Sequence, residues 1–148
     1  MMTHGFHALK ILTAAVVLAL GVANAQSRIV ASVPFDFEVA NRYMERGEYT
    51  FTIDLSRATV LVQGHGNDSA AFALSHSTQA GKIDQDAKLI FNRYGDRYFL
   101  SQVRSAGMAD GRELQQSRKE RELLDTSSTK PAIVALIVKA RGVAKAAP

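Results

Sequence analysis

This chain contains no cysteine at any of its 148 positions. Disulfides, thiol chemistry and cysteine-ligated zinc are therefore excluded, so apolar packing alone has to hold the fold together. Long hydrophobic runs are also missing after residue 25, where the longest fully apolar segment covers only 132–138. A membrane-spanning helix needs about 20 apolar residues, so we expect no membrane span in that part of the chain.

Neither sign of charge is in large excess. The sequence carries 18 Lys and Arg against 14 Asp and Glu, a net charge of +4. The basic residues are spread along the chain instead of forming one patch, so the sequence predicts no nucleic-acid surface. No internal repeat is visible either, and the length is typical of a single domain.

The first 25 residues indicate export. Lys10 precedes the apolar run Ile11–Val22, which has the length of a signal-peptide core and is too short for a membrane span. Ala23 and Ala25 are small residues at the −3 and −1 positions of a cleavage site, which predicts Gln26 as the first mature residue. The alternative interpretation is an uncleaved N-terminal anchor.

Three segments follow from this pattern. We expect a removed signal peptide over 1–25, a single β-rich domain over 26–141 and a flexible tail over 142–148. The predicted location of the mature chain is the periplasm or the extracellular space.

Apolar and polar residues alternate with period two through much of the mature sequence, which predicts strands. The expected strand segments are 29–39, 49–55, 60–62, 70–74, 88–94, 97–104 and 133–138. Pro34 suggests an edge or a bulge in the first of them, while 40–47 and 77–86 are expected to be connections. The segment IVALIV at 133–138 is compatible with helix or strand; its β-branched residues and the preceding proline favour a strand buried on both faces.

A short helix is predicted near the C-terminus. Ser117 and Glu120 fit a capping box, in which each side chain satisfies an amide at the helix start. The helix should cover 118–125, with Leu114 as a possible backward extension. It exposes few apolar groups, chiefly Leu123 and Leu124, so we expect it to dock lightly.

These elements predict a mainly β fold, an antiparallel β-sandwich or small barrel of about seven strands with one short helix near the C-terminus. The sequence leaves the choice between sandwich and barrel open, as it does the order of the strands.

Several segments in a fixed order carry a resemblance. They are VPFDFEV at 33–39, GEYTF at 47–51, KLIFNRYGDRYFLSQV at 88–103, GREL at 111–114 and SRKEREL at 117–123. With these segments the chain resembles a family of small secreted bacterial β-rich proteins of uncharacterised function. The resemblance implies export and a compact β-rich domain, and it brings no activity, cofactor or catalytic residue.

The residue types that bind metals are not spaced for it. His65 and Asp68 lie in one turn, and His76 lies at the end of the following strand, so a hairpin would hold the two histidines about 23 Å apart. Asp84 and Asp86 match half of a calcium loop, without its glycine or its closing glutamate. We therefore predict no metal site and no cofactor.

Catalytic patterns are equally weak. Ser75 and His76 are adjacent in a strand and should face opposite sides, and the chain has no G-x-S-x-G elbow. Four acids alternate with apolar residues and are expected to form the solvated face of the sheet: Asp36, Glu38, Glu48 and Asp54. No catalytic residue is predicted, and the chain is not expected to be an enzyme.

The strongest candidate surface is the turn at Gly95-Asp96. Aromatic and cationic residues surround it, namely Arg93, Tyr94, Arg97 and Tyr98. Tyrosine and arginine favour interfaces, so these four residues form a candidate interaction surface. The alternative is that the arginines pair with carboxylates or stack on tyrosine rings and only stabilise the fold.

The sequence thus predicts an exported, non-enzymatic binding or envelope-structural domain. It would act through this hairpin or by homo-oligomerisation as an envelope component. The second hypothesis is a small-ligand carrier with an apolar barrel cavity, and a hydrolase is the third.

Overall fold

The computed structural model describes residues 26–79, 81–128 and 130–139, so the predicted signal peptide over 1–25 and the tail over 142–148 lie outside the described residues. Within these ranges the fold is mainly β, with ten strands and one helix near the C-terminus, which confirms the predicted fold class. The elements are β1 (Gln26–Val33), β2 (Phe37–Val39), β3 (Arg42–Met44), β4 (Gly47–Asp54), β5 (Thr59–Gly64), β6 (Ala70–Gln79), β7 (Ala87–Tyr94), β8 (Arg97–Arg104), β9 (Asp110–Leu114), α1 (Arg118–Thr126) and β10 (Ala132–Val138).

All described strands belong to one strongly curved sheet. Its order runs β1-β4-β5-β6-β9-β8, and β8 then pairs with β7 along one edge and with β2 on the other. Strand β10 continues beyond β7, and β3 continues beyond β2. The described pairings are antiparallel except between β2 and β8, which run parallel at Glu38 and Phe99, so the sheet is mixed.

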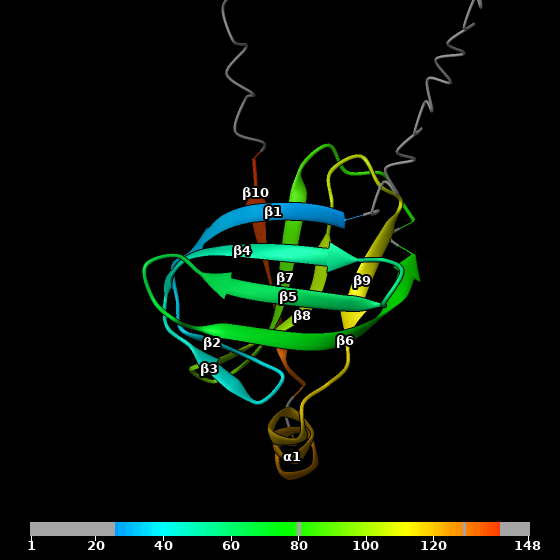
Figure 1. Ribbon diagram of the computed structural model, residues 1–148. Coiled ribbons are helices and arrows are strands. Elements are labelled where there is room, and N and C mark those ends of the chain that lie inside the picture. The colour runs from blue at the N-terminus through cyan, green and yellow to red at the C-terminus, as the bar shows by residue number, and fades with distance from the viewer. Residues whose placement is uncertain (1–25, 80, 129, 140–148) are drawn as a thin grey trace, which may run out of the picture.

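Strand β6 turns the corner between two layers of this sheet. Its first half pairs with β5 and its second half with β9. Figure 1 shows β1, β4 and β5 crossing in front of β7, β8 and β10 at a steep angle. The two ends of the sheet, β1 and β10, come close to each other without pairing. The fold therefore combines the crossed layers of an orthogonal sandwich with the curl of a barrel that stays open at one seam.

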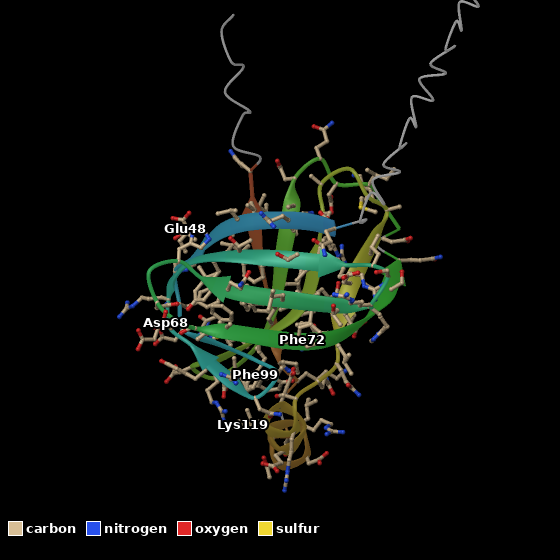
Figure 2. All side chains as sticks on the ribbon, in the orientation of Figure 1. Glu48, Asp68, Phe72, Phe99 and Lys119 are labelled. Carbon is tan, nitrogen blue, oxygen red and sulfur yellow. The ribbon has the colours of Figure 1, made fainter. Side chains whose placement is uncertain are left out.

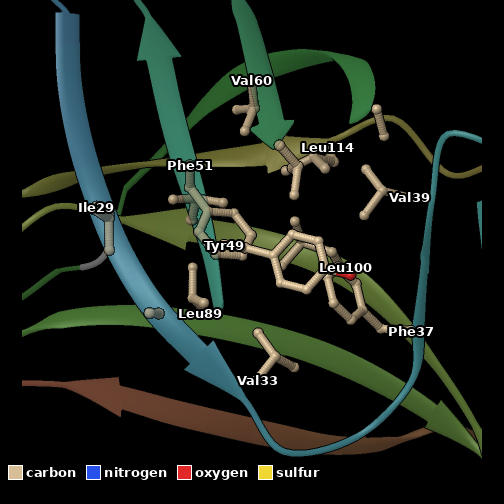
Figure 3. Close-up of a cluster of buried hydrophobic side chains, with 14 of the residues drawn as sticks. Ile29, Val33, Phe37, Val39, Tyr49, Phe51, Val60, Leu89, Leu100 and Leu114 are labelled. Atoms are coloured by element: carbon tan, nitrogen blue, oxygen red, sulfur yellow. The ribbon is translucent and has the colours of Figure 1, made fainter. Parts of the chain in front are cut away.

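Large side chains fill the space between the layers (Figure 3). Tyr49, Phe51 and Phe91 are fully buried there. Phe37 joins them, with its ring 5.1 Å from that of Tyr49 and 5.6 Å from that of Phe91, both edge to face. Such aromatic pairs add to the stability gained from burying their area.

Strand β6 places its small residues inside. Ala71 and Ala73 face the core, whereas Phe72 and Leu74 are each 58% exposed. Because side chains alternate along a strand, the same register that buries the alanines forces the larger side chains outward. Figure 2 shows Phe72 on the outer side of β6.

The strand count differs from the prediction at three places. The segment at Pro34 separates β1 from β2, and β3 lies inside the stretch 40–47 that was expected to be a connection. Ala40 and Asn41, with φ of 49° and 64°, form the tight turn that allows β2 and β3 to pair.

The third difference is β9. Leu114 was expected to extend the helix, but it is buried in β9 opposite Ser75 of β6. The Leu114 side chain reaches the core from the extended backbone of β9, and helix α1 begins only at Arg118.

Helix α1 begins at the predicted cap. The Ser117 side chain accepts a hydrogen bond from the Glu120 amide at 3.2 Å, as a capping box requires. The second half of the box differs, because the Glu120 carboxylate is buried and bonds to β7 instead. Leu123 and Leu124 are only half-buried. None of the helical segments in the described ranges has the length and apolar character needed to cross a bilayer.

Candidate functional site

Strands β7 and β8 form the hairpin that carries the four predicted surface residues. Its turn contains Gly95 in the left-handed region, with φ of 61°. Arg93 pairs with Tyr98, and Tyr94 pairs with Arg97. Directly paired residues share a face of the sheet, so the structure divides the predicted surface into two halves on opposite faces.

Arg97 is bound to a buried carboxylate. Its guanidinium donates from Nη2 and Nε to Glu38 Oε2, at 2.7 Å and 3.2 Å. Lys119 of α1 lies on the other carboxylate oxygen, with Nζ 3.6 Å from Oε1. Glu38 is only 7% exposed, so burial without these two cations would strongly disfavour its charge.

The same arginine covers an aromatic ring. The Arg97 guanidinium carbon lies 5.2 Å from the centre of the Phe99 ring, a cation–π distance. Phe99 is 2% exposed and lies at the end of the sheet where Lys119 and α1 dock (Figure 2). The prediction that Glu38 belongs to the solvated face is therefore wrong, because α1 and Arg97 cover that side of β2.

Tyr94 is bound to the helix. Its hydroxyl donates to Glu120 Oε1 at 3.1 Å, and Asn92 Nδ2 donates to the same oxygen at 2.9 Å. Burial raises the pKa of Tyr94 to about 12, and the charge of Glu120 and its hydrogen bond add to this effect. Glu120 is 3% exposed, so this carboxylate fixes the first turn of α1 onto the hairpin.

Arg93 and Tyr98 occupy the other face. The Tyr98 ring stacks on Phe35 at 3.9 Å between centres, and the Arg93 guanidinium lies 5.5 Å from the Tyr98 ring. Arg93 Nε also donates to the carbonyl of Gly95 at 2.8 Å. The cation therefore helps to close its own turn.

Two surface hollows flank this turn. One of about 300 Å³ is lined by Arg97 and Tyr98 together with residues of β2 and β3. The other, of about 550 Å³, lies between Arg93, Tyr94 and the end of α1. The four predicted residues thus surround one turn, and each of their side chains has a partner within the fold.

Glu38, Asn92 and Glu120 are the residues that the sequence analysis missed at this place. Glu38 alternates with apolar neighbours, and such a pattern is typical of an exposed acid. The signal for Glu120 was the capping box, which identifies its amide but says nothing about the partner of its carboxylate.

The two histidines that were considered as metal ligands lie beside different carboxylates. His65 Nδ1 is 3.4 Å from Glu48 Oε1, and His76 Nε2 is 3.5 Å from Glu113 Oε2. No group of three or more potential metal ligands forms among the residues that the structure describes. Ser75 accepts a hydrogen bond from Arg112 Nε at 3.1 Å, whereas the His76 ring lies beside Glu113.

The four acids do not converge on a cleft either. Asp36 accepts a hydrogen bond from the Tyr43 hydroxyl at 2.6 Å and another from the Arg46 amide. The bond from Tyr43 is the main cause of the lowered pKa of Asp36, and the bond from Arg46 adds to it. Asp54 accepts from the Ser56 hydroxyl at 2.6 Å, which lowers its pKa in the same way. Both carboxylates hold local turns.

Strand β10 forms a second candidate surface. The predicted strand is confirmed, but its predicted burial on both faces is wrong. Ile133 is 74% exposed and Ile137 is 56% exposed, because β10 pairs with β7 alone among the described strands and its outer face is uncovered there. A pocket of about 410 Å³ lies where its end, at Val138, approaches Ser27–Val30 of β1.

Neither the family models, nor the curated proteins, nor the solved structures with which the chain was compared match it. The function is therefore inferred from the geometry of the chain itself.

Proposed function

We propose that this chain is an exported, non-enzymatic domain that binds a partner or builds envelope structure through its outer surface. The observation that carries this proposal is the contrast between a filled interior and an outer surface that displays apolar strands. Tyr49, Phe51 and Phe91 occupy the space between the layers, while Ile133 and Phe72 face outward.

The small-ligand carrier has less support. A carrier of this fold needs a cavity between the layers, and aromatic side chains occupy that position here. The seam pocket at Val138 is the observation that favours a carrier, because it is lined by apolar as well as polar side chains. A hydrolase would need convergent polar groups in a cleft, and the buried acids Glu38 and Glu120 are instead bound to side chains of the fold.

Export is part of the proposal. Intact mass of protein recovered from outside the cytoplasm should correspond to a chain that begins at Gln26. A species that retains Met1 and stays in the inner membrane would contradict it.

Gel filtration of a detergent-free envelope extract tests the binding role. The chain should elute above the mass of a single copy, and long-chain fatty acids added to the purified chain should leave its melting temperature unchanged. A single-copy mass in the extract together with strong stabilisation by the fatty acid would overturn the proposal and support the carrier.

A further inference from the structure

Strand β10 has one edge paired with β7 and a second edge with which no described strand pairs. Its seven residues include no charged side chain and no proline, and its ladder with β7 shows no bulge. Charges, prolines and bulges are the devices that ordinarily keep an edge strand from pairing with another chain. The second edge of β10 is therefore unpaired among the described strands, and β1 comes near its Val138 end without pairing with it.

The sequence of β10 is nearly symmetric about Ala135. On the outer face, Ile133 and Ile137 lie two positions to either side of it; on the inner face, Val134 and Leu136 lie one position away. In an antiparallel pair of two copies centred on Ala135, each Ile133 lies opposite the Ile137 of the other copy. Such a contact is isologous and closes after two copies.

Other registers are poorer. The register between the two copies can change only in steps of two residues, because a step of one would pair outer-face positions of one copy with inner-face positions of the other. A step in one direction places Ile137 opposite Pro131, and a step in the other places Ile133 opposite Lys139. The register centred on Ala135 is the one that matches apolar side chains along the whole strand.

The neighbouring strand is compatible with this contact. Ile90 of β7 lies beside Ala135, so the central row across two copies would be Ile90, Ala135, Ala135 and Ile90. Lys88 lies beside Ile137 in the register, and its Nζ is paired with Asp84 Oδ2 at 2.9 Å. An edge without charge does not select a charged partner, and a second copy of the same apolar strand complements it.

We propose that two copies of this chain join edge to edge through β10, antiparallel about Ala135, so that two open sheets become one continuous sheet. This inference rests on the proposed function and specifies one surface through which it acts. A contact of β10 with β1 of another copy would be head to tail and would grow into open chains. The exposed face of β1 carries Val30 between Arg28 and Ser32, and these two polar residues do not match the isoleucines.

Charge at the symmetry axis tests the contact. Ala135→Lys places two ammonium groups opposite each other and should weaken dimerisation about tenfold or more in sedimentation velocity. Ala70→Lys is the matched control, because Ala70 is also an exposed alanine in a strand but lies on β6. A mixture of Ala135→Lys with Ala135→Glu should restore the dimer, whereas a merely misfolded variant would not be rescued.

Single cysteines test the register, since the chain has none of its own. Ala135→Cys should form a disulfide-linked dimer on mild oxidation, and Ala70→Cys should not. Ile133→Cys alone should stay uncrosslinked, because its symmetry mate would lie about 13 Å away along the strand. Mixing Ile133→Cys with Ile137→Cys should crosslink the two variants.

The outcomes separate this inference from the proposed function. A purified exported chain that stays monomeric at every concentration, or that forms open chains of copies, overturns the β10 dimer. A dimer that Ala135→Lys leaves intact and Ala70→Lys dissolves also overturns it. If the envelope extract still gives a mass above one copy in these cases, the proposed function stands without the β10 contact.

Discussion

Strands β8 and β10 differ in how deeply they are buried, and the difference is the opposite of what their apolar contents suggest. Strand β10 consists entirely of apolar residues, yet Ile133 is 74% exposed. Strand β8 begins and ends with arginine, yet its adjacent residues Phe99 and Leu100 are 2% and 4% exposed. The apolar content of a strand therefore does not decide how deeply it is buried.

Position and cover explain the difference. Strand β8 has β7 on one edge and β9 and β2 on the other, and α1 docks at the side where Phe99 lies. A bulge at Ser101 also resets its alternation, so that Leu100 and Val103 both face the core. Strand β10 has one partner among the described strands and no such cover.

The largest expected effect comes from shortening one apolar side chain in each strand. Phe99→Ala should lower the free energy of unfolding by about 3–5 kcal/mol, because a buried ring leaves a cavity. Ile133→Ala should change it by about 0.5 kcal/mol or less, since the side chain is mostly in water already. Urea denaturation of dilute protein measures both, and equal losses would contradict the comparison.

The two arginines of the hairpin should differ in the same sense. Arg97→Ala removes the main partner of the buried Glu38 and should cost about 1–3 kcal/mol, the usual penalty for a buried polar group left unsatisfied. Arg93→Ala should cost less than about 1 kcal/mol, because its hydrogen bond is a local one at the surface.

These arginine variants also test the predicted interaction surface. If Arg93 and Arg97 only stabilise the fold, binding of any partner should fall in proportion to the folded fraction. Unchanged thermal melts of both variants together with lost association would instead assign recognition to the hairpin.

The turn before β8 should show a smaller effect. Gly95 has φ of 61°, and an alanine there should cost about 1 kcal/mol because its Cβ disfavours this conformation. Gly95→Asn should cost less, since asparagine tolerates the left-handed region better. No contact of an added Cβ contributes, because the space around Gly95 is open within 4 Å. Equal losses for both variants in a thermal melt would exclude this backbone explanation.

The smallest effect concerns the hydrogen bond from Tyr94 to Glu120, which holds α1 against the β7–β8 hairpin. The raised pKa of Tyr94, to about 12, means that the folded chain holds the phenol proton more tightly than the unfolded chain. This contribution to stability is complete below about pH 10, the ordinary tyrosine pKa, and is lost as the pH rises towards 12. The stability difference between wild type and Tyr94→Phe should therefore shrink over this range, and a difference independent of pH would contradict the assignment.

Local patterns predicted the elements whose determinants are local. The alternation in β4, the hairpins β5–β6 and β7–β8 and the cap at Ser117 are all present in the structure.

Features that depend on distant partners could not be predicted in this way. Whether Glu38 is solvated depends on Arg97 and Lys119, which lie far along the chain. Ile133 and Ile137 are exposed because they lie on the uncovered outer face of β10, and the burial of Ala71 follows from the register of β6 with β5. The four predicted surface residues were found around one turn, but their division between two faces follows from the register of β7 with β8.

The parallel contact between β2 and β8 has a consequence for the order of assembly. A chain made from its N-terminus can form β4, β5 and the first half of β6 from neighbouring segments as soon as they emerge. Glu38 can be buried with its charge compensated only after Arg97, 59 residues later in the chain, has been made. Closing a loop of that length costs conformational entropy before any stabilising contact forms, and this cost slows folding. The sheet reaches its full width only when β10 arrives and pairs with β7, so the N-terminal layer exposes its inner face until nearly the whole described chain has been made.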